Sequence, residues 1–199
     1  MPPKVYLAAP FFNHDQLSLV IKLERLIKDE GWEMFSPRLG VSAQEMNTII
    51  NDRKVYYNKW AELIEKGGSP PELPPEAPSP DLRRKVFNDN WSNVDDSDLI
   101  LAVIDDFDVG VMWEVGYAYR AHVPVVTHTG MNYGCNLMLA HSIIGHTKDF
   151  EAVADVLRIA NPSFSLGEHA EEYGKATALI QARYKSEFAL KEGPDERRQ

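Results

Sequence analysis

The stretch LILAVIDDFDVGVMWEVGYA, residues 99–118, decides the fold. It opens with six consecutive apolar residues, a run that is typical of a strand buried on both faces. The chain then turns acidic and leads through a glycine into a helical pattern. Ligands of open parallel α/β sheets bind just outside the carboxyl ends of the strands. The sequence therefore predicts a small-molecule site at the acidic residues 105–108 and at Glu114.

Apolar segments of strand length alternate with helical patterns along the rest of the chain. Expected strands cover residues 5–9, 32–35, 99–104, 123–127 and 142–146. Expected helices cover residues 15–30, 43–66, 81–94, 149–159 and 168–191, and one more begins at Gly110. Asp15 and Asp81 are the predicted caps of the first and third of these helices. Strands separated by helices, with right-handed crossovers, predict a three-layer, doubly wound parallel sheet.

The 199 residues, 44% of them apolar, suffice for one domain over residues 1–199. Residues 69–80 contain six prolines, which favours a stiff surface insertion over a domain boundary. We expect residues 167–199 to form a C-terminal helical extension, whose apolar face would either seal an interface or complete the core.

The composition argues against several classes of protein. A net charge of −9, with 21 basic and 30 acidic residues, disfavours a nucleic-acid partner. Cys135 is the single cysteine, and the six histidines lack metal-ligand spacing, so no metal is expected. The absence of glycine-rich dinucleotide and phosphate-binding motifs predicts no cofactor. No signal peptide and no apolar run near ~18 residues is present, so we expect a cytoplasmic protein without a membrane partner.

Glu114 is the sharpest catalytic candidate. In the first turn of the expected helix, its carboxylate would stay ionised and could act as a nucleophile; alternatively it only complements the helix dipole. Asp108 lies six residues earlier and could accept hydrogen bonds from sugar hydroxyls, or belong to a solvated turn that caps the helix. Gly110 permits a close approach of backbone and ligand.

A second group of candidates surrounds the central strand. Amide and carboxylate groups at residues 88–90, including Asp89 and Asn90, could read the edges of a heterocycle, with Asp89 as a proton shuttle. The alternative is an ordinary surface helix. Tyr6 lies in the first strand, and Phe12 follows that strand, where an aromatic ring either stacks on a planar base or packs in the core.

Taken together, these residues resemble the nucleoside 2-deoxyribosyltransferases. Four pieces carry the likeness: VYLAAPFF at residues 5–12, FNDN at 87–90 through DLI at 98–100, the pattern D-x-G-x-x-x-E-x-G-Y-A at 108–118, and NLM at 136–138. The likeness spans roughly residues 4 to 140. It implies a flavodoxin/Rossmann-like, parallel five-stranded sheet, here with an additional C-terminal helix.

The resemblance also implies a reaction that exchanges the base of a 2′-deoxynucleoside for a free nucleobase, without a cofactor. Glu114 would attack the anomeric carbon and hold a covalent deoxyribosyl intermediate until a second base takes the sugar. Tyr6 would orient Glu114, and Asp108 would bind sugar hydroxyls. Asn136 would reach across from a neighbouring subunit, which implies a homo-oligomer with shared active sites.

One position departs from the family pattern. The family usually has a proton-donating aspartate where this chain has Asn90, and an amide cannot deliver that proton. Either Asp89 serves, or solvent protonates the base, or the base preference has shifted. Two other functions therefore stay open: an N-glycosidase that passes the sugar to water, and a non-catalytic nucleoside-binding protein. The loop sequence AAPFF favours free nucleosides over 5′-monophosphates.

Overall fold

A computed structural model describes residues 2–42, 44–46, 48–49, 78–130 and 137–161. Its sheet has five parallel strands in the order β2-β1-β3-β4-β5. The strands are β1 (Lys4–Ala8), β2 (Glu33–Phe35), β3 (Leu99–Val103), β4 (Val125–His128) and β5 (Gly145–Thr147). The predicted parallel, five-stranded sheet is confirmed, and its strand order is that of the flavodoxin-like doubly wound fold.

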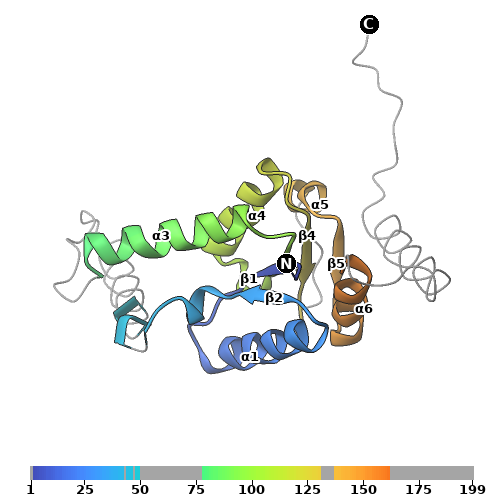
Figure 1. The fold of residues 1–199 in the computed structure, drawn as a ribbon, viewed down its shortest axis with the longest axis horizontal. Helices are drawn as coiled ribbons and strands as arrows, with labels where there is room; N and C mark the ends of the chain where they lie inside the picture. Colours follow the sequence, from blue (N-terminus) through green and yellow to red (C-terminus); the bar gives the residue numbers. More distant parts are fainter. Residues whose placement is uncertain (1, 43, 47, 50–77, 131–136, 162–199) are drawn as a thin grey trace, which may run out of the picture.

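Helices cover both faces of the sheet (Figure 1). They are α1 (His14–Asp29), α3 (Pro80–Asp95), α4 (Val109–Arg120), α5 (Leu137–Ser142) and α6 (Phe150–Ala160). Helices α1 and α6 pack against alternate residues of β1 and β3, such as Leu7 and Leu101, on one face of the sheet. Helices α3, α4 and α5 pack on the opposite face, against the intervening residues of the same strands, such as Tyr6 and Ile100. Two cores on opposite faces give the three layers that the alternation of strands and helices predicts.

The strand at the centre of the sheet is β3. All five of its residues are buried, and each neighbour shares its direction, as a run of six apolar residues requires. Tyr6 of β1 lies level with Ile100 of β3 on one side and with Phe35 of β2 on the other. Tyr6, the one polar side chain among residues 5–8 of β1, therefore lies between the strands β2 and β3.

Two helix caps differ from the predictions. Helix α1 is capped by Asn13, whose side-chain oxygen accepts a backbone N–H at 2.9 Å, so the cap predicted at Asp15 is wrong. Helix α3 begins at Pro80 after Ser79, so the cap predicted at Asp81 is wrong as well. Both aspartates lie in the first turn, where they complement the helix dipole without accepting the capping bond.

The segment after β4 also differs. Residues 137–142 form α5, which the sequence analysis did not predict, and β5 covers 145–147 in place of the expected strand over 142–146. Short apolar runs do not distinguish a buried helix turn from a strand. Here the helix buries Leu139 and Ala140, and Leu139 packs in the core on that face of the sheet. The strand predicted at 123–127 begins at Val125.

Several predictions lie wholly or partly outside the described residues. Of the helix expected over residues 43–66, only 44–46 and 48–49 are described, and these are helical. Most of the proline-rich stretch, Asn136 and the whole of residues 167–199 lie outside. Among the helices of the described part, none is both long enough and apolar enough to cross a membrane.

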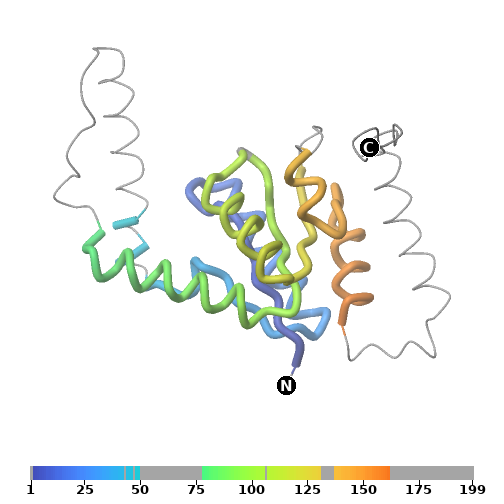
Figure 2. The backbone as a smooth tube through the Cα atoms, turned by 90° about the horizontal axis from the view of Figure 1, so that it is seen from above, coloured from blue at the N-terminus to red at the C-terminus, as the bar shows by residue number. Residues whose placement is uncertain are grey.

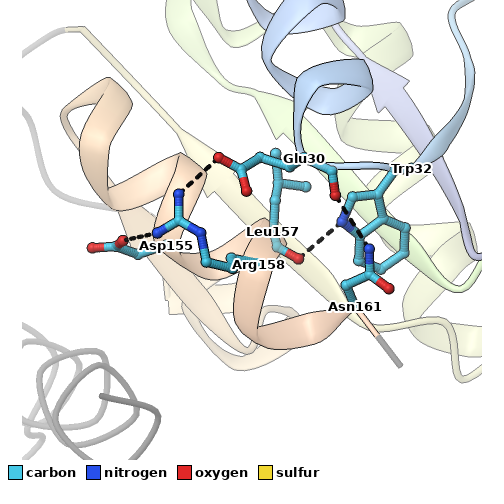
Figure 3. A network of polar contacts seen from close by, with 6 residues as sticks. All are labelled: Glu30, Trp32, Asp155, Leu157, Arg158 and Asn161. Atoms are coloured by element: carbon cyan, nitrogen blue, oxygen red, sulfur yellow. Dashed lines mark hydrogen bonds and ion pairs between the residues drawn. The ribbon is translucent and has the colours of Figure 1, made fainter. Parts of the chain in front are cut away.

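Polar contacts tie the end of α1 and the start of β2 to α6 (Figure 3). The indole Nε1 of Trp32 donates to the carbonyl oxygen of Leu157 at 2.9 Å. Arg158 donates to the Glu30 carboxylate at 2.8 Å, and the Asn161 amide donates to the Glu30 carbonyl oxygen at 3.2 Å. Because Trp32 is only 4% exposed, its bond is the buried one of the three.

Helix α3 extends away from the sheet, past its edge, as the green ribbon and tube show (Figures 1 and 2). Val94, near its C-terminal end, is its one buried residue. The helical residues 44–46 and 48–49 lie beside the N-terminal part of α3 in both views. The outer part of α3 is thus held away from the main core, and its side chains are available to line a site.

Candidate active site

Two side chains donate hydrogen bonds to one carboxylate oxygen of Glu114. The Tyr6 hydroxyl lies 2.6 Å from Glu114 Oε1, although the two residues are 108 positions apart in the sequence. The Asn90 amide Nδ2 lies 3.4 Å from the same Oε1. Three of the residues that the sequence singled out, from β1, α3 and α4, therefore meet at one point.

The position of Tyr6 is fixed by its surroundings. Its side chain is fully buried, and its ring stacks on Phe35 of β2 with 5.5 Å between ring centroids and an interplanar angle of 26°. Burial raises the pKa of the Tyr6 hydroxyl above its usual range, and the neighbouring Glu114 charge and hydrogen bond raise it further. Tyr6 therefore stays protonated and acts as a donor to Glu114.

Glu114 is buried, with 8% of its surface exposed. It is the sixth residue of α4, so it lies in the second turn, and the prediction of a first-turn position is wrong. Burial raises the pKa of the Glu114 carboxyl group to about 7, Asp108 adds to the increase, and the bonds from Tyr6 and Asn90 oppose it. Desolvation thus outweighs the stabilisation of the charged form that the sequence analysis expected from the helix dipole.

Asp108 performs the capping role that the sequence left as an alternative. Its Oδ1 accepts the backbone N–H groups of Gly110 at 2.9 Å and Val111 at 3.1 Å, which fixes the first turn of α4. A Cβ at Gly110 would lie 3.0 Å from that Oδ1, so a side chain there would press on the cap. Asp108 is 8% exposed, and its charge acts on Glu114 one and a half turns further along.

The rest of the acidic turn is directed elsewhere. Asp105 accepts a hydrogen bond from the Thr129 hydroxyl and another, at 3.1 Å, from the Gly130 N–H, so it ties the end of β3 to the end of β4. It lines a smaller cavity of about 290 Å³ next to the start of α1. Within the described part of the chain, no three His, Cys, Asp or Glu side chains are arranged to hold a metal ion.

A pocket of about 580 Å³ opens beside Glu114, between α3, the start of α4 and Ile49. Asn90 and Glu114 contribute polar groups to its lining. Most of the remaining lining is apolar, and includes Leu82, Phe87 and Trp113. A concave, mainly apolar site with a few polar groups next to a carboxyl group of shifted pKa is the usual form of a small-molecule site.

The other predicted site residues lie apart from this cluster or outside the described residues. Asp89 points to Lys85, with 3.4 Å between the charged atoms, and is not part of the pocket lining. Phe12 packs on Phe11 with 4.9 Å between ring centroids, and Phe11 contacts the core on the α1 side of the sheet. The roles assigned to Asp89 and Phe12 remain predictions, as does that of Asn136.

The sequence analysis missed the aromatic residues of α3 and α4. Trp113 stacks on Tyr117 with 5.4 Å between ring centroids, and Phe87 lies 5.4 Å from Trp113. Trp91 donates to the Tyr117 hydroxyl. Residues 87 and 91, and residues 113 and 117, are each four positions apart, so each pair lies on one face of its helix. This spacing could have pointed to the aromatic cluster, although it is also typical of core residues.

Comparison with known proteins shows the family of the chain and proteins of similar fold. Residues 5–142 match the family described as nucleoside 2-deoxyribosyltransferase. Among solved structures, a 2-deoxyribosyltransferase from the psychrotolerant bacterium Bacillus psychrosaccharolyticus is 28% identical, with a TM-score of 0.55 over 76% of this chain and 90% of that chain. A conserved protein from Enterococcus faecalis V583 is 17% identical, with a TM-score of 0.46 over 88% and 99% of the two chains. No curated protein sequence matches significantly.

The family match runs from β1 to the end of α5 and includes Tyr6, Asn90 and Glu114, the residues that the fold brings together. On the length of that match, together with the fold shared with a solved 2-deoxyribosyltransferase, this chain belongs to the nucleoside 2-deoxyribosyltransferase family.

Proposed function

We propose that the protein exchanges the base of 2′-deoxynucleosides, with Glu114 as the nucleophile. The observation that carries the proposal is the arrangement of the Glu114 carboxylate. Both donors, Tyr6 and Asn90, bind Oε1, and Oε2 accepts no hydrogen bond from the residues that the structure describes. Oε1 is thus the oxygen that is held, and Oε2 is the oxygen left to react beside the pocket.

In the first step, a lone pair of Glu114 Oε2 forms a bond to C1′ as the bond from C1′ to the base nitrogen breaks. The electron pair of the broken bond leaves with the base, which takes a proton from solvent or from a group at its edge. In the second step, a nitrogen of the incoming base attacks C1′, the ester bond to Glu114 breaks, and the new base loses its N–H proton. Glu114 returns as a carboxylate, so the cycle needs no cofactor.

The neighbouring residues act on this carboxylate and on the sugar. Tyr6 holds the Glu114 side chain in one position, because the stacked and buried phenol has no room to turn. Asp108 fixes the start of α4 and binds sugar hydroxyls. Asn136 completes the sugar site from a neighbouring subunit of a homo-oligomer. Asn90 contacts both Glu114 and the base, and Asp89 or solvent supplies the proton that an amide cannot give.

A product assay tests the proposal. Purified protein is incubated with deoxythymidine and adenine, and the products are separated by chromatography. We expect deoxyadenosine, and we expect Glu114→Gln to lose activity by several orders of magnitude while Glu33→Gln, at an exposed position on β2, keeps it. If folded wild-type protein forms no deoxyadenosine from deoxythymidine or, in a parallel reaction, from the purine donor deoxyinosine, the transferase function is rejected. Free deoxyribose that forms at the same rate with and without adenine would establish an N-glycosidase instead.

The covalent step has its own test. The protein is incubated with a slowly reacting deoxynucleoside analogue and its intact mass is measured. We expect a mass increase equal to one deoxyribosyl group, located by peptide mapping on the peptide that contains Glu114 and absent from Glu114→Ala. An adduct of the same size in Glu114→Ala would assign the nucleophile to another residue.

A further inference from the structure

The pocket beside Glu114 continues along the outer part of α3. Leu82, Val86 and Asn90 all line it, and their spacing of four residues puts them on one face of the helix. Eight residues of helix correspond to about 12 Å along the axis. The pocket therefore begins at Asn90 and Glu114 and reaches two helical turns outward, toward the end of α3 that lies away from the sheet (Figure 2).

The walls of this outer part are apolar and partly uncovered. Phe87 and Trp113 line the pocket, with 5.4 Å between their rings, and 53% and 46% of their surfaces are exposed. Large rings that face water in a concave site gain free energy when an apolar ligand covers them. Arg83 lines the pocket at the same end.

We propose that this outer part of the pocket selects large bases, namely purines that carry an apolar substituent, over pyrimidines and unsubstituted purines. The inference rests on the proposed function, because C1′ at Glu114 Oε2 fixes where the base begins. A base attached there has its ring next to Asn90, and its far edge points along α3 toward Val86 and Leu82. A single ring leaves Phe87 and Trp113 in contact with water, whereas a substituent on the far edge covers them.

The acceptor preference tests this inference. Exchange from the purine donor deoxyinosine is measured with cytosine, adenine and N6-benzyladenine as acceptors. We expect a KM for N6-benzyladenine at least about 10-fold below that for adenine, because even one methylene in an apolar pocket is worth about 10-fold. In Leu82→Trp or Val86→Trp, the indole fills the outer part, and we expect the two KM values to converge. The matched control, Leu17→Trp on α1, should keep the wild-type ratio.

A direct binding measurement separates this inference from the proposed function. Calorimetric titration of each free base into the wild-type protein needs no exchange. If no base is exchanged but N6-benzyladenine binds at least tenfold more tightly than adenine, and Leu82→Trp removes that difference, the proposed function fails and the pocket assignment holds. Equal affinity of the wild-type protein for adenine and N6-benzyladenine would overturn the assignment, as would a full preference in folded Leu82→Trp and Val86→Trp.

Discussion

The buried carboxyl group of Glu114 makes the stability of the fold depend on pH. Its pKa rises from 4.5 to about 7 on folding, with burial as the main cause. One pKa unit corresponds to 1.36 kcal/mol, so the shift is equivalent to roughly 3 kcal/mol. Because the folded state binds the proton more tightly, this contribution to the free energy of unfolding is present below pH 4.5 and declines as the pH rises to about 7.

The substitution Glu114→Gln removes this dependence. The amide side chain of the variant stays neutral at every pH and keeps an oxygen that accepts the bond from Tyr6, so little else changes at the site. We expect the variant to be more stable than wild type by roughly 3 kcal/mol at pH 8 and by less than about 1 kcal/mol at pH 5. Urea unfolding followed by tryptophan fluorescence at both pH values measures the two differences.

The matched control is Glu33→Gln, which removes a carboxylate from an exposed position on β2. It should change the free energy of unfolding by less than about 0.5 kcal/mol at either pH. A Glu114→Gln variant that is less stable than wild type at pH 8, or equally stabilised at pH 5 and pH 8, would refute the reasoning. The cost of burying the charged Glu114 carboxylate would then be offset by interactions other than the hydrogen bonds from Tyr6 and Asn90.

Three further predictions concern the site and the packing of α6. Tyr6→Phe removes the hydroxyl that stabilises the Glu114 carboxylate, so the acid limb of the kcat/KM profile should move to higher pH and activity at pH 7 should fall at least about 10-fold. Asp108→Asn keeps an oxygen for the α4 cap but removes a charge that raises the Glu114 pKa, so the acid limb of the kcat/KM profile should move to lower pH. Asp108→Ala removes the cap as well, and it should also cost about 1 kcal/mol of stability. Trp32→Phe should destabilise the fold by about 1 to 3 kcal/mol in urea unfolding, because the buried bond from the indole to the Leu157 carbonyl and part of the buried ring are lost, although that carbonyl keeps the Asn161 N–H. Arg158→Ala at the exposed ion pair should cost less than about 1 kcal/mol. Equal effects of the two substitutions would contradict the difference in burial.

Much of the architecture could be read from local patterns. The six apolar residues from Leu99 predict a strand buried on both faces, and all five residues of β3 are buried between the two layers of helices. The order of strands and helices predicts the two layers of helices that α1 and α4 represent. The boundaries were less predictable, since a helix cap depends on one hydrogen bond, which Asn13 makes and Asp15 does not.

The site was predicted in its members but not in its geometry. Their places near the expected strands singled out Glu114, Asp108, Tyr6 and Asn90, and the family pattern added the role of Tyr6 in orienting Glu114. Spacing could not say that two donors bind the same carboxylate oxygen, or that Asp105 is directed to Thr129 and away from Glu114. These contacts join segments that are far apart in the chain, and no local pattern encodes their orientation.

The sequence by itself determined the order of strands and helices except for α5, the place of β3 at the centre, and the residue types at the site. Periodicity and spacing are local properties, so they can be read before the chain folds. Only the tertiary structure decided that Glu114 is buried, that its pKa lies near 7 instead of below 4.5, and that an apolar pocket runs outward along α3. The reason is physical: desolvation and the shape of a cavity depend on every segment packed around a group, and they exist only once those segments meet.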